Sequence, residues 1–249
     1  MAFPDKFVKN VPHYSGLGHL VNTVIHVGAH EAEELLFYVT KLKAKNIMLF
    51  EPNPDKFDII RTAIDYINGN YKVNIIFYPL GLGSGNGKHT LTSFQGRSSG
   101  WASLLKPKIK ELRSALRQDS REHTAHGGGV DSSPIFYEVF TTTLNAAINR
   151  NPEFKDTDLM VVDTQGYELE VLRGSTNVLP RVKSIDLEVT INSASGFYEN
   201  NPSEKACTKF LNTYGYEPDI SVSSFWGQAK HGRLLYRNTY YSVANTRAD

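Results

Sequence analysis

The sequence predicts an α/β fold in which helices cover a mostly parallel sheet, and three observations lead to this class. Apolar runs typical of buried parallel strands alternate with segments whose apolar residues recur at helical spacing. Two of these runs, residues 24–27 and 47–50, enclose one helical segment and form a strand–helix–strand unit. The chain closes with two strand-like segments, 216–222 and 234–243, which imply one late antiparallel strand. A length of 249 residues fits a single domain, residues 1–249, of this kind.

The first strand–helix–strand unit has the features of a ligand site, because such sites lie at the carboxyl ends of parallel strands. Its first strand ends at Gly28, where the chain must turn sharply. Its second strand ends at Glu51, 23 positions later, a suitable spacing for a carboxylate that accepts both hydroxyls of a ribose. The alternative is that Gly28 is only a turn and Glu51 only a helix cap.

The turn after Gly28 disfavours a phosphate-bearing cofactor. It lacks the G-x-G-x-x-G pattern, and Glu31, Glu33 and Glu34 follow in what we expect to be the first helical turn. These carboxylates would repel the pyrophosphate of NAD or FAD, and a P-loop pattern is absent from the sequence. S-adenosylmethionine carries a sulfonium and an ammonium instead of phosphate, so it tolerates acidic neighbours.

The other elements are expected in chain order. They are a helix opened by Pro52 and Pro54, a strand over 72–78, a short strand at the margin of the sheet over 88–94, a strand over 136–142, a helix from Leu144, a strand over 158–163, a helix closed near Gly174, a strand over 184–191 and a helix over 204–214.

A helical insert after the third strand, at about 95–135, interrupts this alternation. The helix expected over 105–121 has an apolar stripe beside a basic stripe. The basic residues are Lys106, Lys110, Arg113, Arg117 and Arg121. Arg113 and Arg117 are candidates for binding a phosphate-bearing acceptor, although such a stripe is most often a solvated face. Trp101, and Tyr198 further along the chain, could wall an acceptor pocket or could simply pack.

Composition adds several expectations. The formal net charge of +1 indicates no global attraction to nucleic acid or membrane. The single cysteine, Cys207, fits a reducing compartment, and residues 1–20 contain no apolar segment of the signal-peptide type, so we expect a cytoplasmic protein without membrane insertion. His123 and His126 have no third ligand at matching spacing, so we expect metal to be dispensable.

Four motifs resemble the FkbM family of methyltransferases: VIHVGAHEAEE, LFEPNP, TTTLN and DLMVVDTQGYELEVLRGSTNVL. The last is the most specific, and the resemblance covers about 21–216 outside the insert. It implies the class I, Rossmann-like methyltransferase fold with a seven-stranded sheet. It also implies S-adenosylmethionine as cofactor and methyl transfer to hydroxyl oxygens of sugars and other small molecules. The family usually has Asp at His26, Asn at His30 and Gly at Ala32.

The resemblance also implies roles for site residues. Gly28, Ala29 and His30 would contact the methionine moiety, Glu51 would hold the ribose with Pro52 beside it, Gly81 and Leu82 would flank the adenine, and Asp163 would face the reacting centre.

Two strand acids are candidates for the base that takes the proton of a hydroxyl acceptor. Asp163 ends one central strand and Glu188 lies on its neighbour. Alternatively, Asp163 only positions Gln165 or a backbone amide. Two other functions stay open. One is 2′-O-methylation of RNA, for which Asp163, Lys183 and Glu188 supply part of a Lys-Asp-Lys-Glu set. The other is non-catalytic binding of S-adenosylmethionine, suggested by His26 and Ala32.

Overall fold

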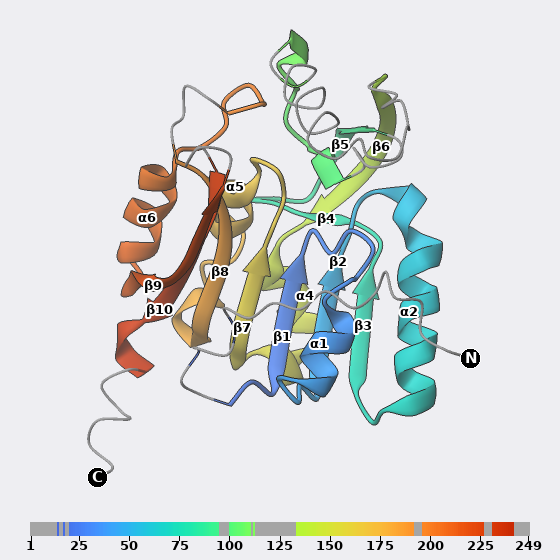
Figure 1. Ribbon diagram of the computed structural model, residues 1–249, viewed down its shortest axis with the longest axis vertical. Helices are drawn as coiled ribbons and strands as arrows, with labels where there is room; N and C mark the ends of the chain where they lie inside the picture. The colour runs from blue at the N-terminus through green and yellow to red at the C-terminus, as the bar shows by residue number, and fades with distance from the viewer. Residues whose placement is uncertain are drawn as a thin grey trace.

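A sheet of seven strands runs through the molecule in the order β3-β2-β1-β7-β8-β10-β9 (Figure 1). The computed structural model describes residues 14, 17, 20–94, 100–110, 112, 133–191, 196–226 and 231–241. The strands of the sheet are β1 (Thr23–Val27), β2 (Asn46–Phe50), β3 (Asn74–Tyr78), β7 (Thr157–Val162), β8 (Val182–Thr190), β9 (Tyr216–Trp226) and β10 (His231–Asn238). β10 pairs antiparallel with both neighbours, and the other pairs are parallel. The predicted fold class is therefore confirmed.

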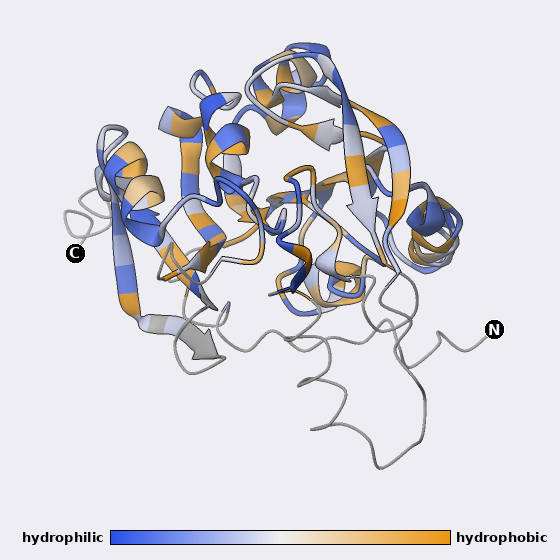
Figure 2. Cartoon of the chain, turned by 90° about the horizontal axis from the view of Figure 1, so that it is seen from above, coloured by the Kyte–Doolittle hydropathy of each residue, from blue (hydrophilic) through white to orange (hydrophobic). Residues whose placement is uncertain are grey.

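Helices cover both faces of the sheet. They are α1 (Leu35–Thr40), α2 (Phe57–Asn70), α4 (Leu144–Arg150), α5 (Glu168–Arg173) and α6 (Glu204–Asn212), with the 3₁₀ turns η3 (Pro54–Lys56), η5 (Pro152–Phe154) and η6 (Leu179–Arg181). Seen end-on in Figure 2, α2 is hydrophilic on one side and hydrophobic on the other. Ile60, Ala63 and Ile67, which recur at helical spacing, form its buried side.

The two faces of the sheet have separate hydrophobic cores, because successive side chains of a strand point to opposite faces. On β1, Val24 belongs to the core under α1 and α2, whereas Ile25 belongs to the core under α4, α5 and α6. Tyr14 and Leu17, from the segment before β1, are buried in the first of these cores. Central strands enclosed on both sides explain the near-continuous apolar runs of the sequence.

A second, three-stranded sheet stands beside the main one, and here a prediction was wrong. The strand expected over 88–94 at the margin of the main sheet is β5 (Gly87–Ser93), and it lies in a separate sheet of order β4-β6-β5. Its other strands are β4 (Gly81–Leu82) and β6 (Ile135–Thr142). β5 pairs antiparallel with β6 over its whole length, from Gly87↔Thr141 to Ser93↔Ile135. This partner comes after the insert, so nothing near β5 in the sequence indicates the pairing.

The last hairpin is displaced from its predicted position. β9 is longer than expected, and β10 ends at Asn238 instead of 243. The Asn238 side chain accounts for this end, since it donates to the Val182 carbonyl at 3.2 Å and accepts from the Tyr240 backbone N–H at 3.2 Å. These two hydrogen bonds turn the chain away from β9 and β8 after Asn238, so the strand pairing ends there.

The described part of the insert is tied to two neighbouring segments. Ser103 exchanges backbone hydrogen bonds with Thr92 of β5. Further on, the Lys108 N–H donates to the Phe197 carbonyl at 2.8 Å, and the Glu199 N–H donates to the Lys106 carbonyl at 2.8 Å. Arg113, Arg117 and Arg121 of the basic stripe lie outside the described residues, as do His123 and His126.

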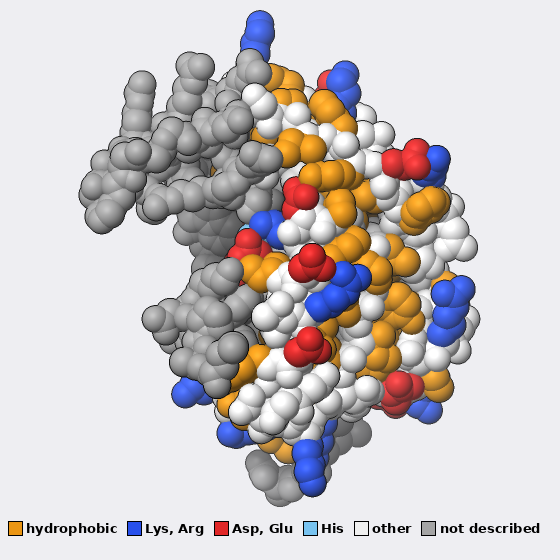
Figure 3. All heavy atoms as spheres, turned by 90° about the vertical axis from the view of Figure 1, so that its right-hand side faces the viewer, with side chains coloured by type: hydrophobic (Ala, Val, Ile, Leu, Met, Phe, Trp, Pro, Cys, Tyr) orange, Lys and Arg blue, Asp and Glu red, His pale blue; other side chains and the backbone are white. Residues whose placement is uncertain are grey.

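The surface carries charges of both signs. On the face shown in Figure 3, which carries α2, the described acidic and basic side chains are interspersed. Within the described ranges, no helix is both long and apolar enough to cross a membrane.

Candidate active site

A cavity of about 290 Å³ opens at the carboxyl ends of β1, β2 and β7, where the sequence predicted a ligand site. All eight residues predicted to bind the cofactor line it: Gly28, Ala29, His30, Glu51, Pro52, Gly81, Leu82 and Asp163. The four segments that carry them are far apart in the sequence, and they follow β1, β2, β3 and β7, which lie side by side in the sheet.

The turn after β1 requires glycine at its first position. Gly28 has φ +80, and a Cβ there would lie 1.8 Å from the carbonyl oxygen of Asp163. The N–H groups of Gly28 and Ala29 both donate to the Phe50 carbonyl, at 2.9 and 3.0 Å. The turn is therefore clamped between the ends of β2 and β7.

The three glutamates after this turn are not in the first helical turn, contrary to prediction. α1 begins at Leu35, and the backbone of Ala32 is left-handed, with φ +57, which interrupts the helix before that point. The acids remain beside the cavity, and Glu33 and Glu34 line it. Glu31 instead pairs with the buried Lys56, at 2.8 Å.

Glu51 is buried and held by backbone groups. One carboxylate oxygen accepts the N–H of His30 and the other accepts the N–H of Asn53, each at 2.8 Å. Burial raises the pKa of Glu51 to about 7, although these two hydrogen bonds oppose the shift. A carboxylate oxygen can accept more than one hydrogen bond, so Glu51 can still accept two ligand hydroxyls at the cavity wall.

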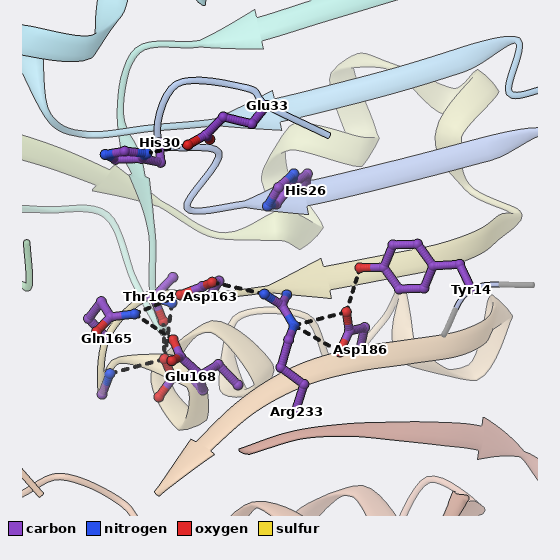
Figure 4. Close-up of polar contacts among 12 residues, drawn as sticks. Tyr14, His26, His30, Glu33, Asp163, Thr164, Gln165, Glu168, Asp186 and Arg233 are labelled. Carbon is purple, nitrogen blue, oxygen red and sulfur yellow. Dashed lines mark hydrogen bonds and ion pairs between the residues drawn. The ribbon is translucent and has the colours of Figure 1, made fainter. Parts of the chain in front are cut away.

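Asp163 is held by side chains. Its Oδ1 accepts the Gln165 amide at 2.8 Å and its Oδ2 accepts Arg233 Nη1 at 3.0 Å (Figure 4). Burial would raise the pKa of Asp163, but the hydrogen bond with Glu188 and the charge of Arg233 outweigh it and hold that pKa well below its usual range. Burial and the charge of Asp163 raise the pKa of Glu188. The surroundings thus push the pKa values of the two acids apart, with that of Asp163 lowered and that of Glu188 raised.

The loop after Asp163 is closed by Glu168. Its Oε1 accepts the Thr164 N–H, the Thr164 hydroxyl and the Gly166 N–H, all at 3.0 Å. Gln165 is thereby held in a left-handed conformation, with φ +54. This contact gives a physical reason for the D-T-Q-G-Y-E sequence, in which the last acid fixes the turn that follows the first.

Gln165 separates the cofactor cavity from a second, smaller one of about 20 Å³, which Glu188 and Tyr198 also line. The Gln165 amide donates to Glu188 at 2.5 Å. Tyr198 donates to the Trp101 carbonyl at 2.5 Å, and Trp101 packs on Phe197 with ring centroids 4.9 Å apart. Tyr198 therefore faces a cavity next to the cofactor site, whereas Trp101 lines neither cavity and packs on Phe197, which lines the second one.

The cofactor cavity suits a ligand with a cationic end, two hydroxyls and a flat apolar part. Acidic Glu33, Glu34 and Asp163 line it, and none of its described lining residues is Lys or Arg. Near Gly81, the side chains of Pro52 and Leu104 lie 3.6 and 3.4 Å from the position of an added Cβ, which indicates a narrow apolar slot. S-adenosylmethionine has these features, and a pyrophosphate would lack donors here. Among the described residues, no group of three or more His, Cys, Asp and Glu side chains is placed to hold a metal.

The residues behind the RNA alternative do not converge. Lys183 lies near the start of β8 and pairs with Asp158 at 2.6 Å, at the end of the sheet opposite Asp163. His26, which suggested a non-catalytic protein, is a buried residue whose ring lies 3.2 Å from the Tyr38 hydroxyl. His26 also lines the cofactor cavity.

Sequence reasoning missed Arg233, which pairs with Asp163, and the partners Asp186 and Tyr14 beyond it. It treated Gln165 only as a residue that Asp163 might position. Each of the first three is a single polar residue in an otherwise ordinary segment, so no local signal marks it. Gln165 could have been found from its place in the specific motif after β7.

The sheet order, the glycine turn and the cation-tolerant cavity define a class I methyltransferase fold that uses S-adenosylmethionine. The family can be stated more closely. Residues 26–218 match the Methyltransferase FkbM domain, and the chain belongs to this family. No match is found among curated protein sequences.

Solved structures resemble this chain at low sequence identity. The FkbM methyltransferase of Methylobacillus flagellatus KT is 14% identical with a TM-score of 0.53, over 87% of this chain and 43% of that one. This chain thus spans less than half the length of that protein. A putative tRNA (m1A22) methyltransferase of Streptococcus pneumoniae, solved with S-adenosyl-L-methionine, is 10% identical with a TM-score of 0.48, over 91% of this chain and 70% of that one.

Proposed function

We propose that the protein transfers a methyl group from S-adenosylmethionine to a hydroxyl oxygen of a sugar or another small acceptor. The observation that carries this proposal is the cavity beyond Gln165. With about 20 Å³ it has room for one hydroxyl-sized group, and Glu188, Tyr198 and Asn201 surround it with groups that hydrogen-bond to hydroxyls. Its described lining includes no Lys or Arg, which favours a neutral group over a phosphate at the reacting position.

When bound, S-adenosylmethionine supplies an already activated methyl group, so alignment lowers much of the remaining barrier. The Gln165 amide, fixed by Asp163 and Glu188, lies at the wall between the two cavities and would orient the acceptor oxygen. Asp163, the ionised acid of the pair, would take the hydroxyl proton. Since Arg233 and Gln165 already stabilise its charge, Asp163 is a weak base, and we expect its contribution near the lower end of the usual range of roughly 10²–10⁴.

A phosphate-bearing acceptor, such as a nucleotide-sugar, fits the same chemistry if its phosphate lies away from the reacting hydroxyl. Lys110 is exposed at the start of the basic stripe, and Lys106 is exposed and pairs with Glu199 at 2.9 Å. We therefore propose free sugars and nucleotide-sugars as acceptors, with RNA as a third class to be tested.

The test combines binding and product analysis. Calorimetry should show binding of S-adenosylmethionine and none of NAD. Incubation with labelled S-adenosylmethionine and a panel of sugars, nucleotide-sugars and short RNAs should then label a hydroxyl oxygen of a sugar. Absence of cofactor binding would refute the activity as a whole. Label on nitrogen, on carbon or on RNA alone would refute the proposed acceptor while leaving methyl transfer in place.

A further inference from the structure

A row of polar contacts links the segment before β1 to the end of β7 (Figure 4). The Tyr14 hydroxyl donates to Asp186 Oδ2. Arg233 Nε donates to both oxygens of Asp186, at 3.1 and 3.3 Å, while its Nη1 donates to Asp163 at 3.0 Å. The order is therefore hydroxyl, carboxylate, guanidinium, carboxylate, with opposite charges side by side.

This row is buried along one face of the sheet. Asp186 on β8 is fully buried, Tyr14 is 2% exposed and the Arg233 side chain is 13% exposed. A buried charge is costly unless it is paired and hydrogen-bonded, so each member of the row holds its neighbour in one geometry. Neither Tyr14, Asp186 nor Arg233 is among the residues that line the two cavities.

The bridge at Arg233 requires a guanidinium. Two different nitrogens of its planar guanidinium donate to two different carboxylates. The compact ammonium group of a lysine cannot donate to both in this geometry. Tyr14 and Asp186 fix the Nε side of the fork. The position of Nη1 follows, and with it the orientation of the Asp163 carboxylate.

Asp163 passes this orientation to Gln165, because its second oxygen accepts the Gln165 amide at 2.8 Å. The backbone of Gln165 is fixed as well, since its carbonyl accepts the Ser103 hydroxyl at 2.8 Å. We propose that Tyr14, Asp186 and Arg233 are positioning residues that hold Asp163, and through it the Gln165 amide, at the junction of the cofactor and acceptor cavities. This inference rests on the proposed function only in assigning the two cavities to the cofactor and the acceptor.

A spectroscopic test needs no ligand. The chain contains four glutamines, Gln95, Gln118, Gln165 and Gln228, so ¹⁵N-glutamine labelling gives four side-chain amide signals. The Gln165 signal is the one that disappears in Gln165→Glu. We expect Tyr14→Phe, which keeps the buried ring, to move this signal, and Arg233→Lys to move it further.

Binding of S-adenosylmethionine provides the second readout. Energetic coupling through a chain of contacts changes affinity by roughly 2- to 30-fold, and we expect a loss in the lower part of this range in Tyr14→Phe. Tyr216→Phe is the matched control: Tyr216 is fully buried and donates to the carbonyls of Leu179 and Val182, at 2.7 and 2.6 Å, away from both cavities. It should lower thermal stability without moving the Gln165 signal or the affinity.

An unchanged Gln165 signal in a folded Tyr14→Phe variant would overturn the inference, whatever happens to stability. Equal shifts in Tyr14→Phe and Tyr216→Phe would do the same, because they would indicate general loosening. If Arg233→Lys does not fold, Tyr14→Phe decides alone. Failure of the wild-type protein to bind S-adenosylmethionine would refute the proposed function, while the Gln165 signal would still report on the positioning row.

Discussion

Glu51 and Asp163 end the strands on either side of β1 and line the same cavity, but they are held in opposite ways. Backbone N–H groups hold Glu51, and burial raises its pKa to about 7. Side chains from two other strands and a loop hold Asp163, and the pKa of Asp163 lies below its usual range. One acid is thus poised between its protonated and ionised forms at neutral pH, whereas the other is ionised at that pH.

The difference teaches that neighbouring acids of one cleft can have separate tasks. A carboxylate bonded only to nearby backbone is fixed by the local turn and is suited to binding neutral hydroxyls. A carboxylate fixed by a cation and an amide keeps its charge and transmits the position of distant groups. Variants on each side of β1 should therefore fail in different ways.

The largest effect is expected from Gly28→Ala. The new Cβ would meet the Asp163 carbonyl oxygen at 1.8 Å, and the residue would keep a left-handed φ of +80. Overpacking and backbone strain each cost about 1–3 kcal/mol, so we expect a loss of roughly 2–6 kcal/mol in unfolding free energy together with loss of cofactor binding. Chemical denaturation and calorimetry measure the two quantities. Gly69→Ala in α2 is the control, since nothing lies within 4 Å of its added Cβ, and a destabilised Gly69→Ala would remove the steric explanation.

Asp163→Asn tests the role of the ionised acid. It keeps the shape and removes the charge, so a base role predicts a rate loss of roughly 10²-fold, measured in single turnovers with an acceptor found in the panel. Affinity for S-adenosylmethionine should change much less than the rate. Near-normal turnover would reduce Asp163 to a residue that only orients Gln165.

Glu51→Ala tests the other side and should have the reverse profile. Loss of a charged acceptor for the ribose hydroxyls should cost about 1.5–3 kcal/mol of cofactor binding. The rate at saturating cofactor should stay close to that of the wild type. Calorimetry that found wild-type affinity would remove the ribose assignment.

The pKa of Glu51 gives a test without mutation. Affinity for S-adenosylmethionine should rise as pH increases through about 7, because the ionised carboxylate is the better acceptor. Folding stability should change in the other direction. The folded state holds the Glu51 proton up to about pH 7 and the unfolded state loses it near the ordinary value of 4.5, so stability falls between these values by about 1.4 kcal/mol per pKa unit at most.

Glu168 also has a pKa raised to about 7 by burial, so it adds to the fall in stability. Its carboxylate does not line the cofactor cavity. Glu51→Gln should therefore abolish the pH dependence of affinity, while part of the pH dependence of stability remains. A Glu51→Gln variant that kept the rise in affinity would assign that rise to another group.

The smallest effect is expected from Ala32→Gly, next to the loop whose His30 N–H binds Glu51. Ala32 is buried with φ +57, a conformation that glycine adopts without strain. We expect a gain of about 0.5–1 kcal/mol in unfolding free energy. Ala63→Gly, at a buried position inside α2, should instead lose about 1 kcal/mol or more. A loss in both variants would indicate that burial of the Ala32 methyl group outweighs the strain.

The sequence was informative wherever a contact is local. The alternation of apolar runs predicted a mostly parallel sheet with a late antiparallel strand. The Gly28 turn and Glu51 marked the cofactor cavity, because the residues that shape it follow the strand ends directly. The pairing of β5 with β6 across the insert could not be read in this way. The same holds for the Tyr14–Asp186–Arg233 row, since these residues contact one another only after three distant segments of the chain have come together.

The hydrogen bond of Tyr14 has a consequence for the order in which the protein matures. Its partner Asp186 lies 172 residues further along, and Arg233 lies 70 residues beyond Asp163. During synthesis the glycine turn and Glu51 are present early, but Asp163 can pair with Arg233 only after β10 has been synthesised. Contacts of such long sequence separation form late in folding. The turn and acid that line the cofactor cavity can thus form before Asp163 is fixed, and the site reaches its full geometry only when β10 enters the sheet.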